Sequence, residues 1–452
     1  MVARRFFGTD GIRGRANEEP LVADTIARIA RATARVVLPA GEGTLVAGHD
    51  GRASAAGILD AWLPPFLEVG TEAVEVGLVT TPGLAHLVRR RGFSLGVMVS
   101  ASHNPPGDNG IKLFGPGGEK LPDRVEEEIE RVVEAGAAAA RTGGNGTRRR
   151  DASPCHEIIE HLAQETAPGL SLRGVRLVVD CANGGASRIA PAVFARLAAE
   201  VVPFADVPDG TNINVGCGAL HPSAVADEVR RRGANLGLAL DGDGDRAVFV
   251  DEQAQVVPGE AILLGLARDA LERGILPART LVTTVMSSTA LRRALAALGG
   301  RLEVVPVGDR AVVEAMRRGR LGLGGEPSGH VVFDGTGAYT GDGVFTALRV
   351  LECLRRRGER LSSWREGFHP FPQSLLSVPV ASKPPLESLA PLGEEIARAE
   401  RQLGPDGRVL VRYSGTEPVV RVFVEGSDAE AVAESAGRIS RLLERTIGRP
   451  GP

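Results

Sequence analysis

The chain has 452 residues, more than one hydrophobic core organises, so about three or four domains are expected. Hydrophobic residues make up 43% of the chain and charged residues 24%, proportions that are ordinary for a globular protein. The net charge of -3 leaves no basic excess to neutralise phosphates, so the composition argues against a nucleic-acid-binding protein.

The apolar stretches and the cysteines indicate a cytoplasmic protein. The sequence lacks the apolar run of a signal peptide, and no stretch approaches the ~18 consecutive apolar residues of a membrane helix, so no membrane partner is expected. The four cysteines form no C-x-x-C pair, which fits a reducing compartment better than a disulfide framework or a zinc site. They are Cys155, Cys181, Cys217 and Cys353.

Short apolar runs alternate with helical patterns through the first three quarters of the chain. This alternation predicts βαβ units, and therefore α/β domains with mixed, mostly parallel sheets that are covered on both faces. The expected strands cover 45–47, 95–99, 175–179, 236–240, 281–285 and 304–307, and the expected helices cover 24–37, 288–298 and 309–317.

Breaks in this alternation divide the chain into four expected domains. Residues 134–151 and 357–384 accumulate Gly, Pro, Ser or Arg, and a softer break follows Gln253. The tail predicts a smaller α+β domain with Ser427 as the N-cap of its last helix. Its expected elements are helices at 389–403 and 427–447 and strands at 408–412 and 419–425. Three similar α/β domains are expected at 1–150, 151–253 and 254–366, followed by the α+β domain at 367–452.

One layout recurs, in which an apolar strand runs into a polar, glycine-rich loop. It occurs at loops 100–110, 241–246 and 324–330. Ligand sites in open α/β sheets gather at the carboxyl ends of strands. We therefore expect the three loops to face one shared cleft.

The loop 241–246, Asp-Gly-Asp-Gly-Asp-Arg, is a candidate metal site. Carboxylates at i, i+2 and i+4 can turn toward one point, where their like charges would repel without a cation. An EF-hand is excluded because Arg246 occupies the position that calls for Gly, and because both flanks look like strands. Most isolated Asp-Gly pairs are hairpin turns, but three aspartates weaken that explanation. Few, hard carboxylate ligands favour Mg²⁺.

The loop 100–106, Ser-Ala-Ser-His-Asn-Pro-Pro, places two hydroxyls beside an imidazole. A turn stabilised by Ser and Asn side chains commonly has this composition. The sequence contains neither the G-x-S-x-G elbow of hydrolases nor a Walker A loop. Lys112, one of three lysines with Lys120 and Lys383, follows as a candidate acid/base or phosphate ligand. A metal beside a serine, without a nucleotide site, favours a serine that carries the phosphoryl group.

Three further loops offer ligands for phosphate or sugar, although each alone is more commonly an ordinary turn. Loop 8–14 presents Arg13 between glycines, and loop 324–330 presents a carboxylate, a hydroxyl and an imidazole. Loop 412–418, followed by Arg421, offers two guanidinium groups and two hydroxyls, which suit a phosphate dianion.

Together, and in this order along nearly the whole chain, these five loops resemble the α-D-phosphohexomutase superfamily. Further segments are most similar to its members that act on glucosamine phosphates: 7–14 (FGTDGIRG), 180–184 (DCANG), 212–214 (NIN), 217–218 (CG), 221–222 (HP) and 340–343 (TGDG). The resemblance implies four domains around a central cleft. It also implies one Mg²⁺ bound by phosphate on Ser102, the serine immediately before His103, and by Asp241, Asp243 and Asp245.

The reaction implied by the resemblance is an isomerisation by intramolecular phosphoryl transfer. Phosphoserine at Ser102 would convert glucosamine 6-phosphate into a sugar bisphosphate, which acts as intermediate and activator. The bisphosphate would reorient and return its other phosphoryl group, leaving glucosamine 1-phosphate for UDP-N-acetylglucosamine and cell-wall synthesis. Such chemistry depends mostly on positioning and charge neutralisation. The superfamily also leads us to expect a homodimer.

The resemblance further distributes roles over the residues of this chain. Two positions depart from the family pattern, Pro327 in place of Gln and Tyr413 in place of a small residue or Pro, and neither removes a catalytic group. The reacting end would be lined by Arg13, His103, Lys112, Arg246 and His330, with Lys112 and His330 as acid/base candidates. Sugar hydroxyls would be bound by Glu326 and Ser328, and the non-reacting phosphate by Arg412, Ser414, Gly415, Thr416 and Arg421.

Three other activities remain open from the sequence. A phosphomannomutase/phosphoglucomutase would use the same machinery on other hexoses. A non-catalytic sensor of sugar phosphates could keep the fold without the turnover. A hydrolase using the Ser102 and His103 pair would release inorganic phosphate with little isomer formation.

Overall fold

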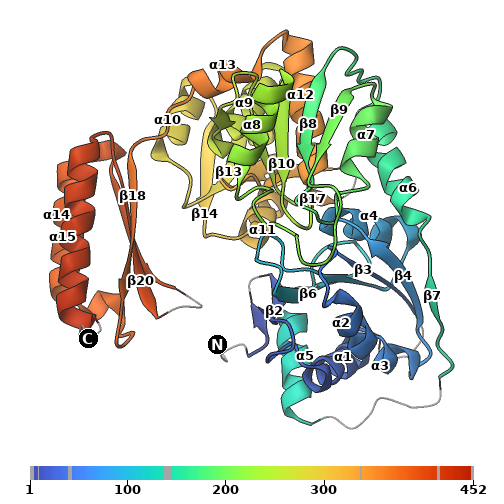
Figure 1. The fold of residues 1–452 in the computed structure, drawn as a ribbon. Coiled ribbons are helices and arrows are strands. Elements are labelled where there is room, and N and C mark those ends of the chain that lie inside the picture. The colour runs from blue at the N-terminus through green and yellow to red at the C-terminus, as the bar shows by residue number, and fades with distance from the viewer. Residues whose placement is uncertain are drawn as a thin grey trace. The chain divides into compact units, whose positions relative to one another are not determined.

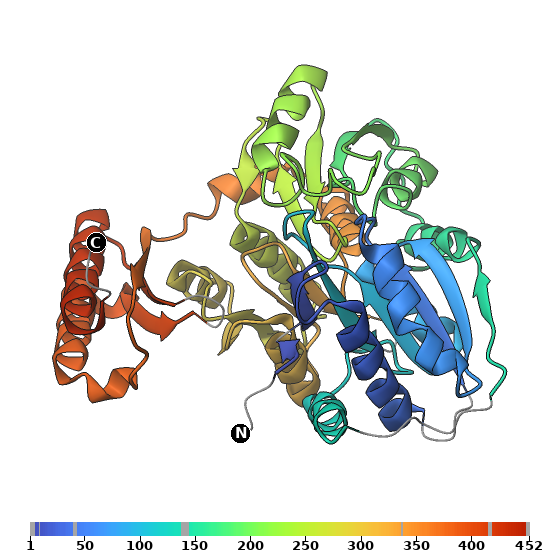
Figure 2. The same ribbon diagram turned by 60° about the horizontal axis from the view of Figure 1, so that its bottom comes forward.

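The computed structural model describes residues 5–8, 10–38, 43–136, 144–335, 338–414 and 418–448. The chain forms two compact units, one from residues 1–285 and 303–365 and the other from 286–302 and 366–452 (Figure 1, Figure 2). Three mixed sheets with their helices and one small antiparallel sheet make up these units. The expected α/β class is confirmed, while the bounds of the four domains stay a prediction.

The first sheet combines parallel and antiparallel pairs. Its strands are β1 (Phe7–Gly8), β2 (Gly11–Arg15), β3 (Thr44–His49), β4 (Glu72–Leu78), β5 (Leu95–Val99), β6 (Asp108–Phe114) and β7 (Arg148–Arg150), and its helices are α1 (Ala23–Val37), α2 (Ala55–Trp62), α3 (Pro64–Leu67), α4 (Thr81–Arg91) and α5 (Asp123–Glu134). The order is β1-β2-β6-β5-β3-β4-β7, parallel from β5 to β7 and antiparallel elsewhere. Because helices cover both faces, β5 is buried along its whole length.

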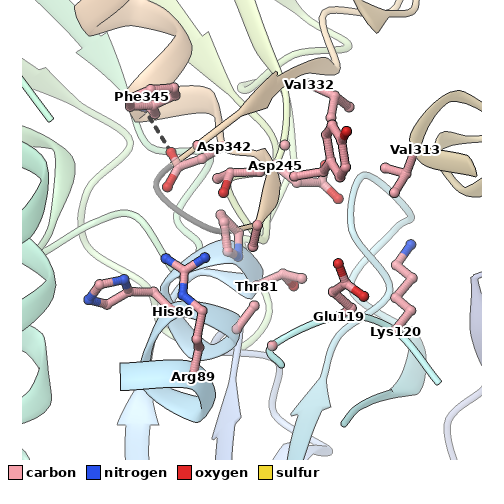
Figure 3. A pocket seen from close by; sticks show the side chains of 18 of the residues that line it. Thr81, His86, Arg89, Glu119, Lys120, Asp245, Val313, Val332, Asp342 and Phe345 are labelled. Atoms are coloured by element: carbon pink, nitrogen blue, oxygen red, sulfur yellow. Dashed lines mark hydrogen bonds between the residues drawn. The ribbon is translucent and has the colours of Figure 1, made fainter. Parts of the chain in front are cut away.

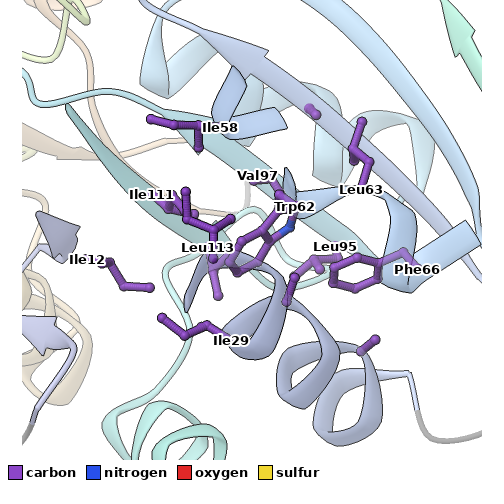
Figure 4. Close-up of a cluster of buried hydrophobic side chains, with 14 of the residues drawn as sticks. Ile12, Ile29, Ile58, Trp62, Leu63, Phe66, Leu95, Val97, Ile111 and Leu113 are labelled. Atoms are coloured by element: carbon purple, nitrogen blue, oxygen red, sulfur yellow. The ribbon is translucent and has the colours of Figure 1, made fainter. Parts of the chain in front are cut away.

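The two faces of this sheet are covered differently. Helix α4 packs on one face, where Gly48 and Gly96 leave room for Leu84 and Val88. The other face carries α1, α2, α3 and α5 over a hydrophobic core (Figure 4). Within it, Trp62 is fully buried and its ring centroid lies 6.0 Å from that of Phe66. Truncating such an aromatic typically costs about 3–5 kcal/mol, so this core gives β5 and β6 a rigid base.

The second and third sheets are also mixed. The second has the order β12-β11-β10-β8-β9 and the third β14-β13-β15-β16-β17. Their strands are β8 (Arg176–Asp180), β9 (Glu200–Phe204), β10 (Leu236–Leu240), β11 (Ala247–Val250), β12 (Val256–Val257), β13 (Thr280–Thr284), β14 (Arg301–Val305), β15 (Leu323–Gly325), β16 (Val331–Asp334) and β17 (Tyr339–Gly341). Their helices within the first unit are α6 (Pro154–Glu160), α7 (Ala190–Arg196), α8 (Pro222–Arg232), α9 (Gly259–Glu272), α11 (Asp309–Gly319), α12 (Gly343–Arg357) and α13 (Leu361–Glu366). Among the described residues, no helix combines the length and the apolarity needed to cross a membrane.

The second unit contains the antiparallel sheet β18-β20-β19. Its elements are α10 (Thr289–Ala297), β18 (Gln373–Pro379), α14 (Ala390–Leu403), β19 (Arg408–Tyr413), β20 (Val419–Glu425) and α15 (Ala429–Ile447). Helices α14 and α15 pack on the sheet through a core that includes Val422 and Ile439. The predicted N-cap Ser427 is wrong, because the carboxylate of Asp428 accepts from the backbone N–H groups of Glu430 and Ala431.

Three elements lie where the sequence predicted breaks. Strand β7 falls in the first break, where Arg148 and Arg149 are paired with Glu75 and Glu72 on β4. Helix α13 and strand β18 fall in the second break. Strands β7 and β18 are edge strands and α13 has only six residues, so none of the three has an apolar pattern long enough to reveal it.

Candidate active site

The aspartate loop 241–246 begins where β10 ends. One oxygen from each of Asp241, Asp243 and Asp245 lies within 4.8 Å of the others. Asp241 and Asp243 are fully buried, and the side chain of Asp245 is 13% exposed. Glycine is required at both intervening positions: Gly244 has φ of 74°, and a Cβ on Gly242 would lie 2.6 Å from the carbonyl oxygen of Ser102. The expected convergence of the three carboxylates is therefore present.

These carboxylates fit a divalent cation. The Oδ1 atoms of Asp243 and Asp245 are buried without a hydrogen-bond partner, which is costly for a polar atom unless something else satisfies it. Burial, together with repulsion by Asp245 and Asp243, raises the pKa of Asp241 well above its usual range. A bound cation would offset both penalties, and sparse hard oxygen ligands suit Mg²⁺.

The serine loop meets the aspartate loop directly. Ser102 Oγ donates to Asp241 Oδ2 at 2.6 Å and lies 3.2 Å from His103 Nδ1. Ser100 does not share this position, since its Oγ accepts the backbone N–H of Ser102. Burial and the nearby Arg246 and Arg13 lower the pKa of His103 to about 4, so its imidazole is neutral at pH 7.

Lys112, on β6, faces the same carboxylates from the first sheet. Its Nζ lies 2.8 Å from Asp243 Oδ2, 3.0 Å from Asp10 Oδ2 and 3.8 Å from Asp245 Oδ2. Although burial opposes its charge, Asp10 and Asp243 raise the pKa of Lys112 well above its usual value. The ammonium group therefore stays protonated at neutral pH.

His330, Arg246 and Arg13 complete a cationic wall around the triad. His330 Nδ1 lies 3.7 Å from Asp245 Oδ1, too far for a hydrogen bond but close enough for charge attraction. Burial opposes its charge, yet Asp245 raises the pKa of His330 to about 9. The backbone N–H of Arg246 donates to Asp241 at 3.1 Å, while Arg13 Nη1 donates to the carbonyl of Ala101 at 3.0 Å.

The loop after β15 presents Glu326 and His330 from one turn. The N–H of Glu326 donates to the carbonyl of His330 at 2.8 Å, and Glu326 Oε1 accepts from the N–H of Gly308 at 3.2 Å. Ser328 lies at the exposed tip. Pro327 is held closely, because a Cβ on Gly259 would come within 2.3 Å of its carbonyl oxygen.

The C-terminal loop of the second unit brings two predicted phosphate ligands together. Arg412 on β19 and Arg421 on β20 are opposite each other in register, so both side chains leave the same face of the sheet. Ser414 is buried, and its N–H donates to Val419. Lys383 donates to the carbonyl of Ser414 at 2.9 Å, a contact that was not predicted. The predicted ligands Gly415 and Thr416 lie outside the described residues.

Two residues that contact the aspartate loop or Lys112 were not singled out from the sequence. Thr81, the first residue of α4, donates through Oγ1 to Asp243 at 2.5 Å and through its N–H to the carbonyl of Asp243 at 2.9 Å. Asp10 pairs with Lys112, Arg13 and Lys120. Asp10 stood in the quoted Arg13 loop, so the sequence carried a signal for it. Thr81 carried none beyond its place at a helix start.

A cavity of about 510 Å³ borders this site (Figure 3). Asp245 and His330 form part of its wall, and Thr81, His86, Arg89 and Lys120 line it elsewhere. The carboxylate of Asp342, which accepts from the N–H of Phe345, also faces it. Of the three carboxylates of the aspartate loop, that of Asp245 thus borders this cavity.

Comparisons with known proteins match all four parts of the chain. Models of phosphoglucomutase/phosphomannomutase alpha/beta/alpha domains I, II and III match residues 4–140, 157–255 and 258–371, and the model of the C-terminal domain matches 375–442. A phosphoglucosamine mutase of Anaeromyxobacter dehalogenans is 45% identical over 459 residues, covering 99% of this chain and 100% of the relative. One from Symbiobacterium thermophilum is 42% identical, covering 98% and 99%.

Comparison with solved structures finds the same family. A phosphoglucomutase/phosphomannomutase family protein of Burkholderia thailandensis superimposes with a TM-score of 0.80 at 26% identity, covering 97% of each chain. A putative phosphomannomutase of Thermus thermophilus shares the fold, with a TM-score of 0.75 at 24% identity over 98% of this chain and 100% of that one. With four domain matches in order and full-length relatives above 40% identity, this chain belongs to the phosphoglucomutase/phosphomannomutase family.

Proposed function

We propose that this chain is a phosphoglucosamine mutase, an isomerase that interconverts glucosamine 6-phosphate and glucosamine 1-phosphate for UDP-N-acetylglucosamine synthesis. The observation that carries the proposal is the hydrogen bond of Ser102 Oγ to Asp241 within a buried carboxylate triad. A hydroxyl in that position is poised to carry a phosphoryl group beside a cation. Full-length relatives bearing the name phosphoglucosamine mutase support the amino-sugar substrate.

Asp241, Asp243, Asp245 and the phosphate on Ser102 would hold one Mg²⁺. When bound, the ion supplies charge neutralisation at the transferring phosphoryl group. Arg13, Arg246 and the ammonium of Lys112 supply the remaining positive charge, which is the main requirement of phosphoryl transfer. The neutral imidazole of His103 lies beside Ser102 Oγ and can donate or accept a hydrogen bond there.

The reaction consists of two transfers. In the first, the P–O bond to Ser102 Oγ breaks as a P–O bond to the free sugar hydroxyl forms, giving a hexosamine bisphosphate. Lys112 and His330 are the acid/base candidates: the ammonium of Lys112 can protonate Ser102 Oγ as it leaves, whereas His330, whose pKa is raised to about 9, must first lose its proton before it can accept that of the sugar hydroxyl. After the bisphosphate reorients, Ser102 Oγ attacks its other phosphoryl group and the roles reverse.

Two groups of residues would bind the substrate. Glu326 and Ser328 bind sugar hydroxyls, and the non-reacting phosphate is bound by Arg412, Ser414, Gly415, Thr416 and Arg421. The opposed guanidinium groups of Arg412 and Arg421 support this assignment, since bidentate cations suit a dianion. We further propose domains at 1–150, 151–253, 254–366 and 367–452, a cytoplasmic homodimer, and a sugar bisphosphate as activator.

The second candidate is a phosphomannomutase/phosphoglucomutase with the same machinery. Two observations favour it. The matching domain models bear its name, and Pro327 stands in place of the family's Gln in the turn that we propose binds the sugar. Initial rates on the 6-phosphates of glucosamine, glucose and mannose separate the candidates. We expect the highest kcat/KM with glucosamine 6-phosphate. If that substrate is the poorest of the three, the second candidate replaces the first.

The phosphoserine is tested by mass spectrometry of the peptide that bears residue 102. Wild-type protein treated with a hexose bisphosphate should gain one phosphate there, and Ser102→Ala should lose both the phosphate and turnover. Ser100→Ala is the matched control and should still accept phosphate, because Ser100 Oγ bonds backbone rather than Asp241. Turnover in Ser102→Ala would eliminate the proposed nucleophile, and net release of inorganic phosphate would indicate a hydrolase.

A further inference from the structure

The serine loop has an unusual backbone that something must hold. Ser102 has φ of 52°, in the left-handed region that residues other than Gly rarely adopt. It is buried, with 2% of its surface exposed. Such a conformation persists only where its surroundings enforce it.

Arg52, on the turn between β3 and α2, bonds the backbone of the serine loop from the side of the first sheet. Its side chain is fully buried, and its Nε donates to Asp50 Oδ2 at 2.9 Å. Nη2 donates to the carbonyls of Ser102 and Asn104, both at 2.9 Å. Nη1 donates to the carbonyl of Asp108 at 2.9 Å and to that of Pro105. All five N–H groups of the guanidinium are thus used, and none is left for phosphate or sugar.

Asn214, from the loop after β9, bonds the same two carbonyls from the second sheet's side. Its Nδ2 donates to the carbonyl of Ser102 at 2.9 Å and to that of Asn104 at 3.1 Å. The backbone of Gly242, between two carboxylates of the triad, also packs against the Ser102 carbonyl. The peptide that follows Ser102 is therefore tied both to Arg52 and to the aspartate loop.

We propose that Arg52 is a positioning residue that, with Asn214, holds Ser102 Oγ in line with the carboxylate triad through both phosphoryl transfers. This inference rests on the proposed function. Ser102 alternates between hydroxyl and dianion during turnover, so its loop must keep one geometry while its own charge changes. A displacement of about 1 Å in a reacting group can cost about 100-fold in rate. Lysine cannot substitute, because three donors on one point cannot reach four carbonyls and Asp50.

The test compares Arg52→Lys and Asn214→Ala with wild type and with Arg148→Lys, an arginine whose partners Glu75 and Asp60 lie away from the loop. Enzyme is phosphorylated with a hexose bisphosphate, the phosphorylated fraction is measured by mass, and turnover is expressed per phosphorylated molecule. We expect both loop variants to lose at least 30-fold in kcat, with KM for glucosamine 6-phosphate within about threefold. Phosphoserine should also lose its phosphate to water faster, whereas Arg148→Lys should keep wild-type values.

A residue that only stabilises the fold would lower the active fraction without changing turnover per phosphorylated molecule, and that result overturns the proposal. If Arg52→Lys does not fold, Asn214→Ala decides alone. Should wild type itself fail to accept phosphate at Ser102, the proposed function fails. Should wild type turn over normally while both loop variants match it, only this inference fails.

Discussion

Replacing Gly184 by Ala tests whether backbone packing sets the geometry of the candidate metal site. A Cβ at this position would lie 2.1 Å from the carbonyl oxygen of Gly242 and 2.7 Å from its carbonyl carbon, so the aspartate loop must shift by about 1 Å. Overpacking of this kind typically costs about 1–3 kcal/mol. The displaced residue lies between Asp241 and Asp243, so the shift reaches the metal ligands themselves. A displacement of about 1 Å predicts a loss of about 100-fold in kcat/KM.

The assay combines initial rates of isomerisation over a Mg²⁺ titration with urea unfolding of the full chain. Gly184→Ala should lower the unfolding free energy by about 2 kcal/mol and raise the Mg²⁺ concentration at half-maximal rate by about tenfold or more. Gly57→Ala is the control, because its Cβ would meet nothing within 4 Å inside α2, where the change should add up to about 1 kcal/mol of stability. Wild-type kcat/KM and Mg²⁺ dependence in Gly184→Ala would refute the packing argument.

Three further predictions follow from other sites. Burial, His161 and nearby arginines lower the pKa of His86 to about 3, so its neutral form stabilises the fold at neutral pH and that contribution is lost as pH falls below about 6.5. His86→Phe should remove about 2 kcal/mol of the stability that is lost between pH 7 and pH 4, after discounting for partial exposure. Urea titrations of the variant and of wild type at each pH would reveal the difference, and an unchanged pH dependence would contradict the prediction. Asp428→Ala should cost α15 about 1 kcal/mol and speed amide exchange in its first turn, whereas equal effects from Ser427→Ala would contradict the observed cap. Chelation with EDTA should abolish isomerisation and added Mg²⁺ should restore it and raise the melting temperature; full activity after chelation would exclude a metal at the triad.

The sequence revealed those candidate-site residues that lie in continuous loop motifs. Asp241 and Ser102 could be found because each loop follows an apolar strand, and ligand sites gather at the carboxyl ends of strands. Lys112 stood out as one of only three lysines, shortly after the serine loop. Thr81 and Arg52 could not be found in this way. Each reaches the site only after separate strands and loops have come together, and a buried arginine leaves no periodic pattern.

The fold shows the same division between local and non-local information. Strand β10 and helix α10 were predicted because their apolar runs and caps are local features. Strand β18 was missed, since Leu375 and Leu376 are exposed in a stretch rich in Pro and Ser, and its pairing partner β20 lies forty or more positions further along the chain. Choosing Asp428 over Ser427 as the helix cap likewise depends on backbone direction rather than on residue type.

The three lysines make this chain unusually suited to amine-selective labelling. Lys112 is 1% exposed beside the aspartates, and the side chain of Lys120 is 20% exposed between Asp10 and Asp309. Lys383 is exposed beside Ser414 and the ring of Tyr413. An acylating reagent should therefore modify Lys383 long before the other two. Its rate of labelling would report occupancy of the C-terminal loop, and labelling of Lys112 would report opening of the aspartate loop, without any engineered probe.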